Sequence, residues 1–210
     1  MNIVGVTTCV GERYAGYLAK TLPVWFRTLD SIVIVGTKDQ YDDPWNGDTI
    51  HFLGTDAFTR NGAHFNKAAA LNEGIAHANP TDWILAFDSD ILPPTDWREQ
   101  AQRFARPCCL NSASRYKPTG MYEDKRFYPR GYFQLWHTSD PCAGPFDETS
   151  KHAGRYDTRF AERWPQEQWN DLRFRLTHLG QRAKHWYGPG TTEQQMSRAK
   201  AEAMRVRVAD

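Results

Sequence analysis

Short apolar runs alternate with helical segments through the first half of the chain, and this alternation restricts the possible folds more than any other feature. The run Ile3–Val10 precedes residues 12–26, where apolar side chains recur at helical spacing. Ser31–Gly36 is a continuous β-branched run, which is typical of a parallel strand covered on both faces. The alternation continues with expected strands at 49–53 and 82–87 and expected helices at 66–78 and 96–106. It predicts an α/β fold with a Rossmann-like, mostly parallel sheet and helices on both faces.

The second half of the chain has a different pattern. Strands are expected at 108–114, 131–137 and 173–179, and residues 144–163 are expected to form a loop that enters a helix. A Gly-Pro-Gly break at 188–190 separates these segments from a basic helix expected over 191–206. We therefore expect a single domain over residues 1–190, with halves at 1–106 and 107–190, followed by a C-terminal basic helix within 191–210.

The charge balance excludes a protein that is basic overall, as many nucleic-acid binders are. The 210 residues carry 26 Lys and Arg against 25 Asp and Glu, for a net charge of +1. The charge is uneven, because segments 98–137 and 171–207 each hold eight basic residues against three acids. These segments form either an ordinary solvated surface or a face for an anionic ligand.

The four cysteines show no spacing that is typical of a zinc site. Free thiols in a reducing compartment are the simplest interpretation. Neither a signal peptide nor a long apolar run is visible. We therefore expect a cytoplasmic protein, of a bacterial cell or of a virus-infected host.

The segment Asp88-Ser89-Asp90 has the clearest chemistry in the sequence. It follows the apolar strand at 82–87 and precedes two consecutive prolines. A turn at the strand end can bring both carboxylates to one cation, and hard oxygen ligands favour Mg²⁺ or Mn²⁺. Taken alone, the segment is a weak signal, because a solvated turn is the more common reason for two acids at this spacing. Its position favours a site, because α/β sheets bind ligands at the carboxyl ends of their strands.

Several blocks occur in a definite order between residues 3 and 190. They are V-G-V-T-T at 4–8, F-N-K-A-A-A-L-N-E-G-I at 65–75, W-I-L-A-F-D-S-D-I-L-P-P at 83–94, G-Y-F-Q-L-W at 131–136, G-P-F-D-E at 144–148, Y-D-T-R-F-A-E-R at 156–163 and H-L-G at 178–180. In this order they resemble the nucleotide-sugar glycosyltransferases of the GT-A type, especially family 2. The resemblance implies a GT-A fold, with a nucleotide-sugar-binding half at 1–106 and an acceptor-binding half at 107–190 that contains a smaller sheet.

The same resemblance implies a metal site and a donor site. Asp90 would ligate the metal, Asp88 would contact both the sugar nucleotide and the metal, and His178 would be the third protein ligand. The expected cofactor is Mn²⁺ or Mg²⁺. The donor would be a nucleotide-diphosphate sugar, with a UDP-sugar favoured, and its other expected contacts are Thr7, Thr8, Arg13, Asp39, Lys67 and Ser89.

Two of these donor contacts have an alternative interpretation. Asp39 could accept a hydrogen bond from the base of the nucleotide, or it could be an ordinary turn acid. Lys67 could reach the diphosphate or only cover the edge of the site, next to Asn66, which could cap the following helix.

On the acceptor side, Asp157 matches the general base of inverting relatives. The chain departs from the family pattern at Tyr156, where Glu is usual, and at Arg159, where a second Asp is common. Glu148 is therefore a competing candidate for the base. Inversion and retention of the anomeric configuration both stay open.

Two pairs of residues rich in aromatic side chains lie near the blocks of the second half. Trp136 and His137 could pack beneath the site or form a stacking wall for a sugar. Trp186 and Tyr187 could close over the nucleotide.

The expected reaction is the transfer of a sugar from the nucleotide-diphosphate sugar to a hydroxyl acceptor. An anionic polymer such as hydroxymethylated DNA would suit the basic segments, and a saccharide or a protein is equally open. One alternative is a nucleotidyltransferase, although residues 7–13 lack a convincing Gly-rich basic loop. Another is a nucleotide-sugar-binding module without catalysis.

Overall fold

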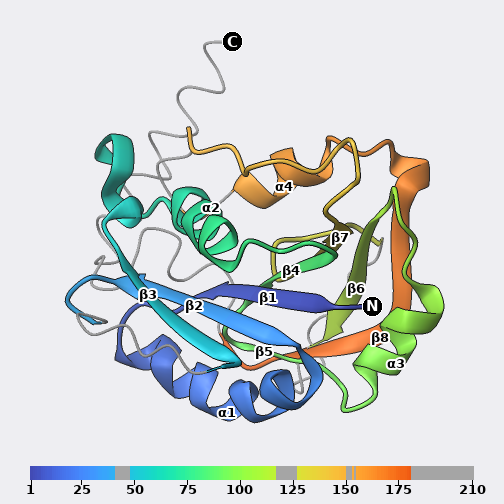
Figure 1. The fold of residues 1–210 in the computed structure, drawn as a ribbon, viewed down its shortest axis with the longest axis horizontal. Helices are drawn as coiled ribbons and strands as arrows, with labels where there is room; N and C mark the ends of the chain where they lie inside the picture. The colour runs from blue at the N-terminus through green and yellow to red at the C-terminus, as the bar shows by residue number, and fades with distance from the viewer. Residues whose placement is uncertain (41–47, 117–126, 150–152, 154, 181–210) are drawn as a thin grey trace.

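The computed structural model describes residues 1–40, 48–116, 127–149, 153 and 155–180 (Figure 1). Its strands are β1 (Ile3–Thr8), β2 (Ser31–Thr37), β3 (Ile50–Thr55), β4 (Trp83–Asp88), β5 (Ile91–Leu92), β6 (Leu110–Tyr116), β7 (Phe133–His137) and β8 (Trp169–His178). Its helices are α1 (Glu12–Thr28), α2 (Lys67–Ala78), α3 (Trp97–Phe104) and α4 (Tyr156–Ala161), with short 3₁₀ helices η1 (Ala57–Gly62) and η2 (Gln166–Gln168). The expected break at 188–190, the expected helix at 191–206, and Trp186 and Tyr187 lie outside the described residues.

The first four long strands form a parallel sheet, as the alternation in the sequence predicted. β1 pairs with both β2 and β4, and β2 pairs with β3, all in the parallel sense. The side chains of β1 are buried throughout, and those of β2 and β4 are buried except at their ends. Burial on both faces explains why these strands are continuous apolar runs.

The complete sheet is mixed, so the expectation of a mostly parallel sheet is wrong for the second half. The strand order is β3-β2-β1-β4-β7-β6-β8-β5. β7 pairs in the antiparallel sense with β4 and β6, β8 is parallel to β6, and β5 is antiparallel to β8. Because β7 extends the hydrogen-bond ladder of β4, the strands of the second half continue the first sheet. In the described part of the chain they do not form the separate smaller sheet that was expected.

The sheet curls back on itself between β4 and β5. Ile91 follows Asp88 by three residues, a span of about 10 Å at most, yet β5 stands at the far end of the strand order. Both conditions hold only if β8 returns to the chain that leaves β4. Ile91 pairs with His178, and Leu92 pairs with Thr177. The curl therefore brings the carboxyl end of β8 to the carboxyl end of β4.

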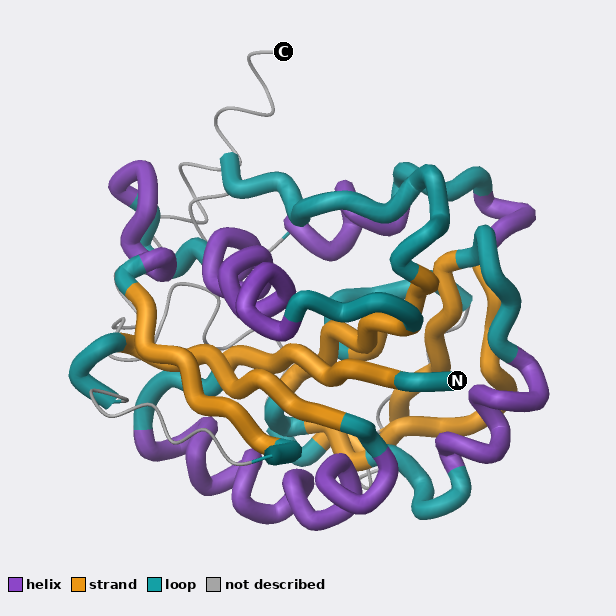
Figure 2. The backbone as a smooth tube through the Cα atoms, viewed as in Figure 1, coloured by secondary structure: helices purple, strands orange, loops and turns teal. Residues whose placement is uncertain are grey.

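Helices α1 and α2 cover opposite faces of the sheet (Figures 1 and 2). Side chains of α1 and α3 pack into one hydrophobic core, and side chains of α2 and α4 pack into another. Gly74 allows α2 to lie close to the sheet, because a Cβ at this position would be 2.6 Å from Val35 and 2.7 Å from Val6. The two-faced covering predicted from the sequence is therefore present.

A side-chain cap marks the start of α2. Asn66 caps α2, since its side chain accepts a hydrogen bond from the backbone amide of Ala69 at 3.0 Å. This confirms the capping role considered for Asn66. The helix expected over 12–26 extends to Thr28, with Pro23 inside it.

Long apolar helices of the kind that cross a membrane do not occur among the residues described above.

Candidate functional site

The chain adds strands on one side of β1 and then crosses to the other side, so the switch in strand order lies outside the carboxyl ends of β1 and β4. From β1 the chain proceeds through α1 to β2 and β3, and α2 then returns it to β4 on the other side of β1. In α/β sheets, ligands bind outside the carboxyl ends of the strands at such a point. Thr8 and Asp88 end these two strands and are paired in register. The loop after β4 therefore emerges where the fold favours a ligand site.

Asp88 forms an ion pair with Lys67, the first residue of α2. The Lys67 side chain is 11% exposed, and that of Asp88 is 30% exposed. Burial alone lowers the pKa of Lys67, but Asp88 and, to a smaller extent, Tyr156 outweigh it, so the pKa lies above its ordinary value. Burial raises the pKa of Asp88 and Asp90 adds to this rise, while Lys67 opposes it. Lys67 therefore stays charged beside the carboxylates.

Asp90 and His178 form a second pair at the same edge. His178 Nε2 lies 3.1 Å from Asp90 Oδ2, and each side chain is 7% exposed. The backbone amide of Leu179 donates to the carbonyl oxygen of Asp90 at 2.9 Å. Gly180 is suited to its position, because a Cβ there would overlap Asp90 Oδ2. The structure brings these two expected metal ligands together, and their role as ligands stays a prediction.

Tyr14 also belongs to this edge, which the sequence did not suggest. Burial, with the charges of Asp90 and Asp88, raises the pKa of Tyr14 from 10.0 to about 12. Its helical spacing in α1 indicates only an inward-facing side chain. The neighbouring carboxylates become visible only once the position of the β4 loop is known.

Arg115, near the end of β6, is a second residue missed by the sequence analysis. Its guanidinium lies 4.4 Å from the ring centroid of Tyr132 and lowers the pKa of Asp88. The available signal was a basic residue near the end of an expected strand. Using it requires the knowledge that β6 runs in the same direction as β4, because both are antiparallel to β7.

Three of the expected donor contacts are buried at the ends of β1 and β4. Thr7 donates its hydroxyl hydrogen to the carbonyl oxygen of Phe87 at 2.8 Å, which ties the two strands together. Thr8 and Ser89 are buried as well. Thr8 and Ser89 thus lie beside Asp88, whereas the hydroxyl of Thr7 is engaged within the sheet.

The other two expected donor contacts are exposed. Arg13 is the second residue of α1, directly after the loop that follows β1. Asp39 lies in the turn after β2. Both positions follow strands that end at the same edge as β4.

Asp157 lies in the first turn of α4, and its Oδ2 accepts a hydrogen bond from the backbone amide of Gly131 at 2.9 Å. Tyr156 beside it is buried, and the Lys67 ammonium lies 5.7 Å from the centroid of its ring. Gly131 leaves room for the side chain of Tyr156, because a Cβ at position 131 would lie 2.9 Å from the Tyr156 hydroxyl oxygen. Helix α4 therefore connects the candidate base to the Lys67–Asp88 pair.

Glu148, the competing candidate for the base, holds neighbouring side chains with both carboxylate oxygens. Oε2 accepts from Arg60 at 3.0 Å, and Oε1 accepts from Asn72 at 2.8 Å. Its backbone carbonyl accepts from the side chain of Asn66 at 2.8 Å. These bonds fasten the loop around Glu148 to α2.

Trp136 and His137 lie away from the carboxylates. Trp136 is buried, and its ring centroid lies 4.8 Å from that of Phe160. His137 Nε2 lies 2.9 Å from Asp82 Oδ1, beside the start of β4 and at the opposite end from Asp88. Of the two interpretations considered, the geometry agrees with packing and not with a stacking wall beside the carboxylates.

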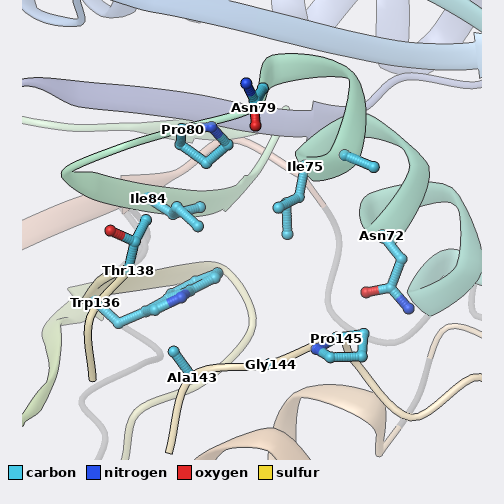
Figure 3. Close-up of a pocket in the computed structure, with 11 residues that line it drawn as sticks. Asn72, Ile75, Asn79, Pro80, Ile84, Trp136, Thr138, Ala143, Gly144 and Pro145 are labelled. Carbon is cyan, nitrogen blue, oxygen red and sulfur yellow. The ribbon is translucent and has the colours of Figure 1, made fainter. Parts of the chain in front are cut away.

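A pocket of about 420 Å³ lies between α2, β4 and the loop after β7 (Figure 3). Ile75, Ile84 and Trp136 are among its apolar lining residues, and Asn72 borders it. Ile84 is near the start of β4, so the pocket lies toward the end of that strand opposite Asp88. None of the expected catalytic, donor-contact or metal-binding residues lines it.

The side chains at this edge include ligand types that a divalent cation accepts. Asp88 and Asp90 offer hard oxygen ligands, and a neutral His178 offers a nitrogen, a set that suits Mn²⁺ better than Mg²⁺. As arranged, Asp88 contacts Lys67 and Asp90 contacts His178. Among the described residues, no group of three or more His, Cys, Asp or Glu side chains converges on one metal position. The donor types fit the metal, and Lys67 engages Oδ1 of Asp88.

Comparisons with known proteins extend only to the fold. No protein-family model matches the chain, and no curated protein matches it. The chain is similar to a solved structure described as a crystal structure of a mycobacterial protein, with a TM-score of 0.55 and 13% sequence identity. The match covers 87% of this chain and 68% of that one. The α/β fold is therefore shared with a solved protein.

Proposed function

We propose that the protein is a GT-A type glycosyltransferase that moves a sugar from a nucleotide-diphosphate sugar to a hydroxyl acceptor, with Mn²⁺ or Mg²⁺ as cofactor. One observation carries the proposal. Asp88, Asp90 and His178, from β4, its following loop and β8, gather outside the carboxyl ends of the strands, where the chain reverses across the sheet. The ordered sequence blocks that resemble family 2 support the same activity.

In this proposal the donor diphosphate binds beside Asp88, and Lys67 and Arg115 supply positive charge to it. A bound metal would be held by Asp90, His178 and Asp88, and it would stabilise the negative charge of the departing diphosphate. Thr8 and Ser89 shape the base of the site, while Arg13 and Asp39 approach the nucleotide from neighbouring strand ends. A UDP-sugar is the favoured donor.

Asp157 is the proposed general base. It would take the proton of the acceptor hydroxyl while the hydroxyl oxygen bonds to the anomeric carbon, and the bond from that carbon to the diphosphate would break. Glu148 is the weaker candidate, because Arg60 and Asn72 engage its two carboxylate oxygens. With a base on the acceptor side, the proposed outcome is inversion.

The acceptor is proposed only as a hydroxyl compound, and a saccharide, a protein or hydroxymethylated DNA would each provide one. Part of the basic surface is used within the fold, since Arg98 pairs with Asp30 at 2.8 Å. Arg103 and Arg173 are exposed and lie over the ring of Phe104, at 5.2 and 5.1 Å from its centroid. If the acceptor is DNA, binding should weaken steeply as salt rises.

We also propose that the protein works in the cytoplasm. Cys108, Cys109 and Cys142 carry free thiols, which agrees with a reducing compartment. This proposal is independent of the choice of acceptor.

The test is a thermal-unfolding panel of nucleoside diphosphates and their sugars, each with and without Mn²⁺. A ligand at a hundredfold excess over its Kd stabilises the folded state by about 2.7 kcal/mol, which for a chain of this size raises Tm by roughly 5–10 °C. We expect a UDP-sugar to stabilise in the presence of Mn²⁺, followed by metal-dependent release of UDP. If the panel leaves Tm unchanged throughout, the proposed function is wrong. Stabilisation without turnover would favour the non-catalytic binding module.

A further inference from the structure

The proposed metal site already contains a cation of its own, the ammonium of Lys67. Lys67 pairs with Asp88, and its ammonium lies 5.7 Å from the centroid of the Tyr156 ring. Lys67 is largely enclosed, and the Tyr156 side chain is 3% exposed. The ammonium is thus held between one carboxylate and one phenol at the carboxyl end of β4.

A divalent cation at Asp88 would compete with this ammonium. Asp88 has one carboxylate group, and two cations bound to it at short range repel each other strongly in a partly buried site. Asp90 is two residues away, and its partner is the His178 imidazole and not Lys67. The interaction that metal binding would weaken is therefore the Lys67–Asp88 ion pair.

Tyr156 gives Lys67 an alternative partner. A carboxylate at this position would add a second anion beside the ammonium, whereas a phenol accepts a hydrogen bond and stays neutral. Burial raises the pKa of the Tyr156 phenol and keeps it protonated. Lys67 can therefore leave Asp88 without becoming wholly unpaired, and a donor diphosphate would supply the anion that it has lost.

We propose that Lys67 and the divalent cation compete for Asp88, and that Tyr156 is the positioning residue that holds Lys67 when Asp88 takes the metal. This inference rests on the proposed function in its metal site and in its diphosphate donor. It makes the metal and the nucleotide diphosphate bind cooperatively, because each compensates for a contact that the other disrupts.

The experiment measures the Kd of Mn²⁺ alone, from the electron paramagnetic resonance signal of free Mn²⁺. Lys67→Met should tighten Mn²⁺ binding about fivefold or more, which is the lower end of ordinary coupling between two ligands. Tyr156→Phe should act in the opposite direction and weaken it, because Lys67 then depends more strongly on Asp88. The matched control is Lys38→Met, which removes an exposed lysine that also pairs with an aspartate, Asp56, and which should leave the Kd unchanged.

A second measurement uses UDP. In the wild type, Mn²⁺ should tighten UDP binding about fivefold or more, and Lys67→Met should reduce this enhancement. Circular dichroism and thermal unfolding of each variant establish that it is folded. Opposite signs for Lys67→Met and Tyr156→Phe exclude a merely structural effect, since a disturbed fold would weaken binding in both.

The inference is overturned if Lys67→Met leaves Mn²⁺ binding unchanged or weakens it, or if no variant binds Mn²⁺. If Lys67→Met tightens Mn²⁺ binding while no nucleotide sugar stabilises the protein, the inference stands and the proposed function fails. If nucleotide sugars bind and react while Lys67→Met has no effect on Mn²⁺, only the inference fails.

Discussion

His178 Nε2 lies 3.1 Å from Asp90 Oδ2, although 88 positions separate the two residues in the chain. Their contact depends on the shortest strand of the sheet, because Ile91, the residue after Asp90, pairs with His178. The backbone amide of Leu179 then donates to the carbonyl of Asp90. Backbone pairing therefore fixes the distance between the imidazole and the carboxylate before any metal is present.

Asp90→Asn should remove the stabilisation that Mn²⁺ gives to the wild type. The variant loses a charged ligand and weakens a buried hydrogen bond, so the free energy of unfolding should fall by about 1–3 kcal/mol without metal. Urea unfolding with and without Mn²⁺ measures both effects. Asp82→Asn is the matched control, because Asp82 also pairs with a histidine, His137, at 2.9 Å but near the opposite end of β4. Asp82→Asn should lower the free energy of unfolding and keep the stabilisation by Mn²⁺. If Mn²⁺ stabilises Asp90→Asn as much as the wild type, the metal assignment is contradicted.

Gly180→Ala should displace Asp90. The new Cβ would overlap Asp90 Oδ2, and overpacking of this kind typically costs about 1–3 kcal/mol. Gly16→Ala is the control, since a Cβ at this position in α1 meets nothing within 4 Å and alanine is the better helix former, by about 1 kcal/mol. Thermal unfolding should therefore shift in opposite directions in the two variants. Equal stability of Gly180→Ala and the wild type would show that Asp90 moves freely.

The sequence predicted the first half of the fold well because its signals are local. Continuous β-branched runs and helical spacing are visible within a few residues, and they indicated β1, β2, β4, α1 and α2 to within a few positions. The curl of the sheet depends instead on pairing between Ile91–Leu92 and the end of β8. A strand of two residues has no periodicity of its own, so β5 and the mixed character of the sheet could not be predicted.

The candidate site was predicted only as far as its charged motifs extend. Asp88 and Asp90 were selected by their chemistry and position, and His178 through a resemblance, and the structure places all three at one edge. The contact between Lys67 and Tyr156 was not predicted, because it joins the start of α2 to α4 across the molecule. Glu148 was selected from its motif, but no motif indicates that Arg60 and Asn72 bond to its two carboxylate oxygens and so give it a structural role.

Tyr14 should ionise at a higher pH than an ordinary tyrosine. Its pKa is raised from 10.0 to about 12, so the unfolded chain loses the phenolic proton first as the pH rises. The contribution of Tyr14 to stability is therefore complete below pH 10 and is lost as the pH rises toward 12. The difference between the tyrosinate absorbance titrations of the wild type and Tyr14→Phe isolates this group.

Asp90→Asn provides the counterpart to that titration. Burial is the largest cause of the raised Tyr14 pKa, and the charge of Asp90 is the next. Removing this charge should lower the pKa of Tyr14, although burial keeps it above 10.0. A Tyr14 titration that is identical in the two backgrounds would place Asp90 too far away to act on the phenol.

Asp157→Asn and Glu148→Gln separate the two candidate bases. Removing a general base typically lowers turnover by 10²–10⁴-fold, so release of UDP from a UDP-sugar should fall by about that factor in Asp157→Asn. The fold should persist, because the asparagine oxygen can still accept from the amide of Gly131. Glu148→Gln should keep most of its activity. Its free energy of unfolding should fall by about 0.5–1 kcal/mol, since the ion pair between Glu148 and Arg60 is partly exposed.

Asp147→Asn is the control for both variants. Asp147 lies next to Glu148, and hydrogen bonds from the backbone and the side chain of Thr149, with a smaller effect of Arg159, hold its pKa below the ordinary value. Its loss should weaken that local contact and leave turnover unchanged. Full activity in Asp157→Asn, together with a large loss in Glu148→Gln, would transfer the role of base to Glu148. The bonds from Arg60 and Asn72 would then have to open during the reaction, because they engage both oxygens of that carboxylate.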